Sequence, residues 1–331
     1  MRIIPIDQYD EKSMILAMPV YDSQRRILIA ANQTIHPKFQ IRLKHMGIRV
    51  LVIEDAISKG ITLEEMIDMP TWLDIAENIR DAHAAVRARK PIQMRDILSA
   101  AGKLIRETQL RPVLVPIPTS TISMDLAPYA HAVNVALLAL QVGNKRGYND
   151  LMLRDLAVGC LLHSIGEAVT ADADKVPEAG FQVLRNVREL SLVSSHIAFQ
   201  YNERLDGSGA PRGIKGSAFH EYAQIGSMCK LYDRAVSSEE LLPHEAMEAI
   251  MAMSGLAYTH GVINDFVRAV PAYPPGTMVK LQSGKEALVV KITNHMQRPV
   301  VRELGSKTEI DLSDHPTVMI QGVKPAEASN F

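Results

Sequence analysis

Two stretches of the chain, 129–170 and 201–216, contain the residues whose types and spacing best suit chemistry. In the first stretch, His131 and His163 lie in apolar segments of helical character. Two imidazoles can hold one soft metal ion, although weakly. The second stretch contains the glycine-rich run DGSG, followed by two basic residues. A glycine pair by itself is a weak sign of a phosphate cradle. Metal binding and anion binding are therefore both open hypotheses at this point.

The adjacent pair His163 and Ser164 does not predict a nucleophile with its base. Neighbouring residues of a helix point about 100° apart around its axis, so their side chains cannot face each other. Ser164 is therefore not expected to act as a nucleophile.

Together the two stretches resemble the HD-GYP branch of the HD metal-dependent phosphohydrolases. In that family the first stretch carries His-Asp-x-Gly-Lys, and the second carries His-His-Glu-x-x-Asp-Gly-x-Gly-Tyr-Pro. Here the second stretch reads YNERLDGSGAPRGIKG. The resemblance covers most of the chain. It implies an α-helical bundle, hydrolysis of the bacterial messenger cyclic di-GMP, and two or three metal ions, often iron or manganese.

The resemblance also implies that most of the family's metal ligands are replaced in this chain. Two positions keep a family histidine, namely His131 and His163. The substituted positions are Ser164 for the bridging Asp, Glu167 for the Lys of Gly-Lys, Val176 for the next His, Tyr201 and Asn202 for the His pair, and Lys230 for a ligating Asp.

These replacements predict that a binuclear metal centre cannot form. Two divalent ions ~4 Å apart repel by roughly 17 kcal/mol at an effective dielectric constant of about 20. Only bridging and terminal anions make such a pair tolerable, and a lysine at Lys230 would add positive charge instead. We expect no cofactor, or at most a single weakly bound Fe, Mn or Zn ion at His131 and His163. His196 is an alternative replacement ligand.

Glu167 and Lys230 exchange the charges that the family has at these two positions. A buried lone charge is unfavourable, whereas a paired one is tolerable. One hypothesis is that the ammonium of Lys230 occupies the space of a metal and pairs with Glu167. The alternative is that both side chains face solvent.

The glycine-rich loop is better retained than the metal ligands. The resemblance implies that Arg212 and Lys215 lie where family members meet the phosphates of the bound dinucleotide, beside the loop residues Asp206, Gly207 and Gly209. The alternative is that both basic side chains are ordinary solvated charges. Ala210 stands where the family has Tyr, which weakens the expectation that the loop keeps the family's partner contacts.

The chain is predicted to be mainly α-helical and to have four parts. Residues 1–66 mix short strand-like runs with one helical run, which is typical of a small α+β module. Residues 67–123 predict a helical connector, or a signal-transmitting helix, followed by a proline-rich extended linker. Residues 124–270 predict the helical bundle of an HD domain. Residues 271–331 predict a small β subdomain, with a hairpin signal at QSGK.

Composition limits the classes of partner. The net charge of −1 over 331 residues gives no electrostatic case for nucleic-acid or membrane binding. No apolar run approaches the ~20 residues of a membrane span, and the first residues are not expected to form a signal peptide. Cys160 and Cys229 lie in apolar helical patterns and are predicted to be reduced thiols. We expect a cytoplasmic protein, with the oligomeric state left open.

The sequence favours a degenerate HD-GYP-like signalling protein without phosphodiesterase activity. It would bind cyclic di-GMP or a protein partner through the former active-site cleft and the DGSGAPRG loop. One alternative is a divergent metal-dependent phosphodiesterase acting on cyclic di-GMP or a related nucleotide. The other alternative is a purely structural or oligomerisation module.

Overall fold

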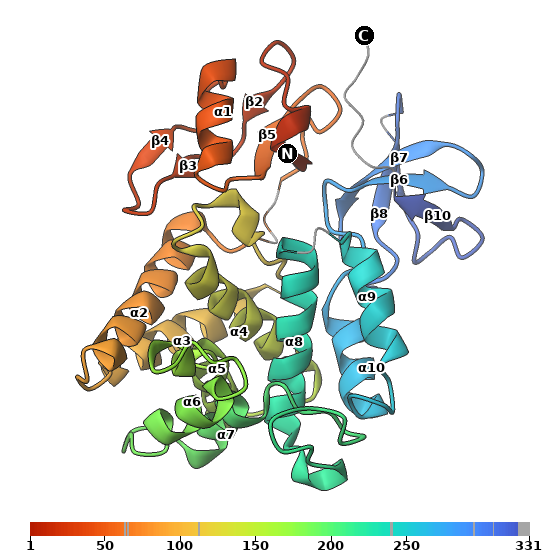
Figure 1. The fold of residues 1–331 in the computed structure, drawn as a ribbon. Coiled ribbons are helices and arrows are strands. Elements are labelled where there is room, and N and C mark those ends of the chain that lie inside the picture. Colours follow the sequence, from red (N-terminus) through yellow and green to blue (C-terminus); the bar gives the residue numbers. More distant parts are fainter. Residues whose placement is uncertain are drawn as a thin grey trace. The chain divides into compact units, whose positions relative to one another are not determined.

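The computed structural model describes residues 1–62, 64, 66–111, 113–238, 241–293, 295–306 and 308–323. The chain divides into two compact units. Unit 1 comprises Met1–Glu64, Pro118–Ala127 and Pro271–Phe331, and unit 2 comprises Glu65–Ile117 and Pro128–Val270. The predicted mainly α architecture, with small β-containing modules near both ends, is confirmed (Figure 1). The predicted four-part division of the chain stays a prediction.

The N-terminal part of unit 1 is a three-stranded antiparallel sheet with one helix and a short hairpin. The sheet has the order β1-β5-β2, and Arg2 pairs with Ile53 in its register. Apolar side chains of these elements form a core of their own, which includes the fully buried Ile4, Ile48 and Ile53. The elements are β1 (Arg2–Pro5), β2 (Ile15–Leu16), β3 (Val20–Tyr21), β4 (Ile27–Ile29), α1 (Pro37–His45) and β5 (Val50–Glu54).

The C-terminal part of unit 1 is a five-stranded antiparallel sheet with the order β10-β6-β7-β8-β9. The hairpin predicted at QSGK is confirmed, because β6 and β7 pair around it. Arg302 of β8 donates hydrogen bonds of 3.3 Å to the carbonyl oxygens of Ile57 and Lys59, which ties this sheet to the N-terminal part. The strands are β6 (Met278–Leu281), β7 (Glu286–Lys291), β8 (Val300–Glu303), β9 (Glu309–Asp311) and β10 (Ile320–Val323).

Unit 2 is a helical bundle in which α8 stands between α2–α7 on one side and α9 and α10 on the other (Figure 1). No helix in the described ranges is long and apolar enough to cross a lipid bilayer. The helices are α2 (Met69–Arg87), α3 (Met94–Leu110), α4 (Ala127–Lys145), α5 (Asp150–Leu161), α6 (Val176–Leu184), α7 (Leu192–Gln200), α8 (Glu221–Ser237), α9 (Pro243–Ala252) and α10 (His260–Ala269).

Helix α4 lies at the centre of unit 2 because it is apolar almost all round. Thirteen of its residues between Ala130 and Gly143 are buried, which is the pattern of a core helix. Its two buried amides are hydrogen-bonded. Gln141 accepts from the backbone N–H of Leu114 at 3.0 Å and donates to the Leu114 carbonyl at 2.8 Å. The second amide, Asn134, contributes to the site described below.

The loop after α7 is organised by the buried carboxylate of Glu203. Its side chain is fully buried and accepts hydrogen bonds from the backbone N–H groups of Arg212 at 3.0 Å and Ile214 at 3.2 Å. The loop can close this tightly only with glycine at Gly209, where a Cβ would lie 2.4 Å from the backbone of Glu203. Glu203 therefore holds the two ends of the glycine-rich loop together.

We expect Glu203→Gln to destabilise the protein by about 2 kcal/mol, because one buried hydrogen bond to a charged acceptor is replaced by two N–H groups that face each other. Urea unfolding measures this change. Asp206→Asn is the matched control, since Asp206 caps a turn of the same loop from an exposed position. An equal effect of the two substitutions would contradict the anchoring role of Glu203.

His83 on α2 is a buried polar residue without a partner. Its side chain is 1% exposed, and neither ring nitrogen has a hydrogen-bond partner among the described residues. The ring meets Tyr129 edge-on, with the centroids 5.2 Å apart. Burial, together with the charge of Arg87, lowers the pKa of His83 to about 4. The folded protein therefore holds this imidazole in its neutral form.

Protonation of His83 should oppose folding in mildly acidic solution. The unfolded chain binds this proton near pH 6.5 and the folded chain only near pH 4. The stability that His83 contributes is thus complete above about pH 6.5 and is lost as the pH falls to about 4, by about 3 kcal/mol. We expect His83→Phe to flatten the dependence of unfolding free energy on pH across this window. Parallel pH profiles of the two proteins would contradict the assignment.

Candidate functional site

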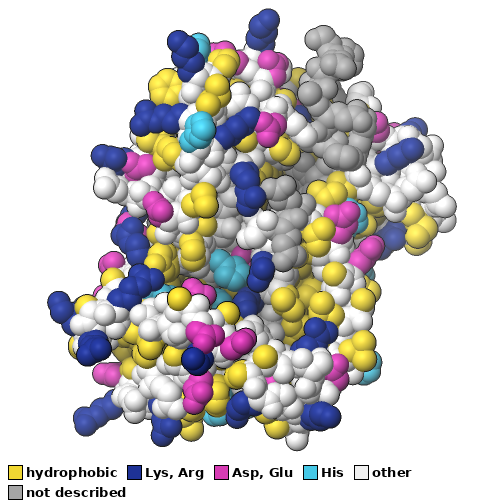
Figure 2. Space-filling model, in the orientation of Figure 1, with side chains coloured by type: hydrophobic (Ala, Val, Ile, Leu, Met, Phe, Trp, Pro, Cys, Tyr) yellow, Lys and Arg dark blue, Asp and Glu magenta, His cyan; other side chains and the backbone are white. Residues whose placement is uncertain are grey.

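Unit 2 brings together most of the residues that the sequence assigned to a metal site. His131 lies on α4, His163 follows α5, Tyr201 and Asn202 follow α7, and Lys230 lies on α8. The ring centroids of His131 and His163 are 5.6 Å apart, and those of His163 and Tyr201 are also 5.6 Å apart. We call these five residues the His–Lys cluster. Figure 2 shows histidine surface next to lysine or arginine surface near the middle of the displayed face.

In both histidines of the cluster, Nδ1 forms a hydrogen bond to another residue of the protein. Nδ1 of His131 lies 2.5 Å from Oδ2 of Asp233, and Nδ1 of His163 lies 2.7 Å from the carbonyl oxygen of Cys160. His163 is buried, whereas the side chain of His131 is 22% exposed. Burial lowers the pKa of His163 well below its usual range, and the nearby His131 and Lys230 act in the same direction. His163 is therefore neutral at physiological pH.

The ammonium group of Lys230 lies over the ring of Tyr201, 4.0 Å from its centroid, and donates a hydrogen bond of 2.8 Å to Oδ1 of Asn202. Partial burial and the charge of Arg234 lower the pKa of Lys230 to about 8, while Glu167 opposes this shift. The ammonium thus has the amide of Asn202 as a hydrogen-bond partner, and Glu167 acts on it as a nearby charge. The hypothesis that Lys230 pairs with Glu167 stays a prediction.

The remaining substituted positions lie around the turn that follows α5. Ser164 is half-buried and precedes the 3-10 helix Ile165–Ala168, which contains Glu167. Desolvation raises the pKa of the Glu167 carboxyl, and the positive charge of Lys230 opposes this. Val176 is buried at the start of α6. Its carbonyl oxygen packs so closely on Gly166 that a Cβ there would lie 2.0 Å away, so Val176 belongs to a packing contact.

The basic residues of the glycine-rich loop are held by the loop itself. The guanidinium of Arg212 lies 3.9 Å above the centroid of Phe199, and its Nε is 3.9 Å from Oε1 of Glu203. The exposed Lys215 lays its methylene stem over Gly207, where a Cβ would lie 2.4 Å from Cε. Asp206 accepts hydrogen bonds from the backbone and hydroxyl of Ser208. Phosphate contacts by Arg212 and Lys215 stay a prediction.

His196 does not join the cluster as a replacement ligand. Its ring contacts Phe181 and Phe199, with centroids 5.3 and 6.4 Å away. These two phenylalanines stack on each other at 4.5 Å. Its position on α7, several residues before Tyr201, turns it toward α6 rather than toward His131 and His163.

Asp233 is the residue of this region that sequence reasoning missed. Its side chain is buried and contacts His131 through Oδ2 and the amide of Asn134 through Oδ1, at 2.5 and 2.8 Å. A signal was present, because Asp233 follows Lys230 by three residues and so shares its helix face. Asn134 follows His131 by the same spacing. The two helices thus each present a pair of polar residues at the same level.

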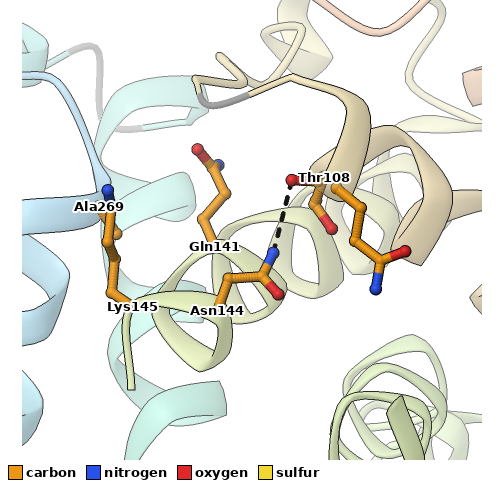
Figure 3. Close-up of a pocket in the computed structure, with 6 residues that line it drawn as sticks. Thr108, Gln141, Asn144, Lys145 and Ala269 are labelled. Atoms are coloured by element: carbon orange, nitrogen blue, oxygen red, sulfur yellow. Dashed lines mark hydrogen bonds between the residues drawn. The ribbon is translucent and has the colours of Figure 1, made fainter. Parts of the chain in front are cut away.

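A separate polar pocket lies elsewhere in unit 2, near the end of α3 (Figure 3). Asn144 and Lys145 of α4 line it, and Nδ2 of Asn144 lies 3.5 Å from the carbonyl oxygen of Thr108. Gln141, which also lines it, already has its amide satisfied by Leu114. None of the cluster residues lines this pocket.

The potential metal ligands among the described residues do not fit a centre of two or three metal ions. No group of three or more His, Cys, Asp or Glu side chains within the described ranges is placed to hold a metal ion. Asp233 has both carboxylate oxygens engaged inside the protein. Lys230 adds a positive charge where a metal pair would need anions. Binding of a single ion by His131 and His163 stays a prediction.

Comparisons with known proteins show what the chain resembles. No family model matches it. It is 27% identical over 263 residues to the cyclic di-GMP phosphodiesterase PA4108 of Pseudomonas aeruginosa, which covers 70% of this chain and 62% of that protein. It is 24% identical over 165 residues to a cyclic di-GMP phosphodiesterase of Thermotoga maritima, which covers 44% of this chain and 45% of that protein. The chain thus spans less than two thirds of the first relative and less than half of the second.

Among solved structures, an HDG"Y"P protein from Bdellovibrio bacteriovorus aligns with a TM-score of 0.49 and 15% identity, over 80% of this chain and 97% of that one. The two sequence relatives, both cyclic di-GMP phosphodiesterases, support the resemblance to the HD-GYP family that the 129–170 and 201–216 stretches carry.

Proposed function

We propose that this protein binds cyclic di-GMP at the His–Lys cluster without hydrolysing it. The observation that carries the proposal is the position of the Lys230 ammonium, which lies over the ring of Tyr201 and donates a hydrogen bond to Asn202. The family resemblance implies that relatives carry a metal-ligating Asp at this position. A single organic cation would therefore face the phosphodiester where family members use metal ions.

The charges and donors of the cluster suit a phosphodiester monoanion. Lys230 is the cation, and one of its three N–H groups is used on Asn202. Burial raises the pKa of Tyr201, so its hydroxyl keeps its proton and can donate a hydrogen bond. Ammonium and hydroxyl groups are among the donors that hold phosphate oxygens in proteins. The two cyclic di-GMP phosphodiesterases among the relatives support this choice of ligand.

The same cluster lacks what hydrolysis needs. Family hydrolysis depends on metal ions that generate hydroxide at neutral pH. An ammonium stabilises phosphate charge but does not turn water into a nucleophile. The carboxylate of Asp233 is turned into the protein, away from any role as a bridging anion. Binding without turnover follows from this combination.

The first test is the affinity for cyclic di-GMP. We expect Lys230→Met to weaken binding by roughly 10- to 100-fold, because a charge-assisted hydrogen bond is worth about 1.5–3 kcal/mol. Isothermal titration calorimetry measures the change. Lys145→Met is the matched control, since Lys145 is an exposed lysine on α4 outside the cluster. Unchanged affinity in Lys230→Met, or no binding by the unaltered protein, would refute the site.

The second test is turnover. Protein purified from medium supplemented with iron and manganese should yield no linear dinucleotide from cyclic di-GMP above the level of a mock preparation, as followed by chromatography. His131→Ala should leave that background unchanged. Hydrolysis that His131→Ala abolishes would favour the alternative function, a divergent metal-dependent phosphodiesterase.

A further inference from the structure

We propose that Asp233 is a positioning residue that fixes the proton and the orientation of His131, so that the cluster selects ligands carrying a hydrogen-bond donor next to their anionic group. The identity of the ligand rests on the proposed function. The role of Asp233 toward His131 does not, because it concerns the protein alone.

A buried chain of hydrogen bonds holds Asp233 in place. The indole Nε1 of Trp72 on α2 donates to Oδ1 of Asn134 at 2.9 Å. Nδ2 of Asn134 donates to the carbonyl of Ile117 at 2.9 Å and to Oδ1 of Asp233 at 2.8 Å. The donors of Asn134 therefore dictate which oxygen of Asp233 remains for His131. Trp72 and Asn134 are fully buried, so water does not compete for these hydrogen bonds in the folded protein.

This series of hydrogen bonds determines the tautomer of His131. A carboxylate oxygen accepts hydrogen bonds, so the proton of the bond to Asp233 must lie on Nδ1. In the uncharged form of such a ring, the lone pair lies on Nε2. The carbonyl of Cys160 fixes the same tautomer in His163. Neither Nε2 has a hydrogen-bond partner among the described residues. The cluster thus contains two imidazole acceptors beside the donors of Lys230 and Tyr201.

A ligand that pairs with the donors and with the imidazole acceptors must accept hydrogen bonds at one position and donate one at a neighbouring position. A phosphodiester oxygen accepts from Lys230 and Tyr201, but it has no proton to give to an imidazole lone pair. In a ribonucleotide, the 2′-hydroxyl sits on the carbon next to the 3′ ester and supplies that proton. The cluster is therefore expected to prefer a ribose over a deoxyribose cyclic dinucleotide, by about tenfold in affinity for one hydrogen bond.

The role of Asp233 is tested by the nitrogen chemical shifts of the two imidazoles, read by NMR on the ¹⁵N-labelled full chain at about pH 8. In the unaltered protein both rings should carry the proton on Nδ1. Asp233→Asn should move the proton of His131 to Nε2, because Asn134 still requires an acceptor and the substituted amide then offers an N–H to Nδ1. His163, held by a backbone carbonyl, is the control inside the same sample.

A His131 protonated on Nε2 in the unaltered protein would overturn the proposal even if the variant does not fold. A proton that stays on Nδ1 in folded Asp233→Asn would overturn it as well.

Ligand selection is tested by titrating cyclic di-GMP and its 2′-deoxy analogue. The unaltered protein should bind the ribose form about tenfold more tightly, and Asp233→Asn should reduce this preference. Equal affinities for the two nucleotides would overturn the selection. If neither binds, the proposed function and the ligand selection both fall, whereas the NMR result still decides the role of Asp233.

Discussion

The buried hydrogen-bonded carboxylate of Asp233 is the constraint on which the helical unit depends. A carboxylate in the protein interior is tolerated only when its oxygens are hydrogen-bonded. His131 and Asn134 supply those bonds, and Asn134 is in turn satisfied by Trp72 and Ile117. Because each partner would be left unsatisfied without the others, α2, α4 and α8 must meet in one fixed arrangement. His131 is the residue of this hydrogen-bonded group that also belongs to the His–Lys cluster.

The electrostatics of the His–Lys cluster favour a site with one positive charge and otherwise neutral side chains. Desolvation lowers the pKa of the buried His163 and raises that of the buried Tyr201, so it favours the neutral form of both. Lys230, with a pKa of about 8, remains the charged group at neutral pH. An environment that disfavours additional charge in this way tolerates one cation and favours the binding of one anion next to it. A pair of divalent ions would require the opposite environment, with carboxylates bridging between the metals.

Local pattern was sufficient to predict much of the fold. The hairpin of β6 and β7 follows from turn residues between alternating strands, and α4 follows from its apolar run. Motif position also placed His131, His163 and Lys230 in one region. The hydrogen bond of Lys230 with Asn202 was not predicted, because a charge swap in the sequence does not reveal which neutral side chain lies next to the ammonium. Asp233 was missed because its bond to His131 joins residues 102 positions apart, a separation that periodicity does not report.

Different physical constraints act on the motif residues that this chain retains and on those that it replaces. A side chain at Gly209 would collide with the backbone, and Glu203 binds two backbone N–H groups of the same loop. These residues must persist in any chain with this loop, whatever it binds, so their presence indicates the fold. Lys230 contacts Tyr201 and Asn202 through their side chains. The scaffold leaves such positions free to change, and the chemistry of this protein is therefore to be sought in them.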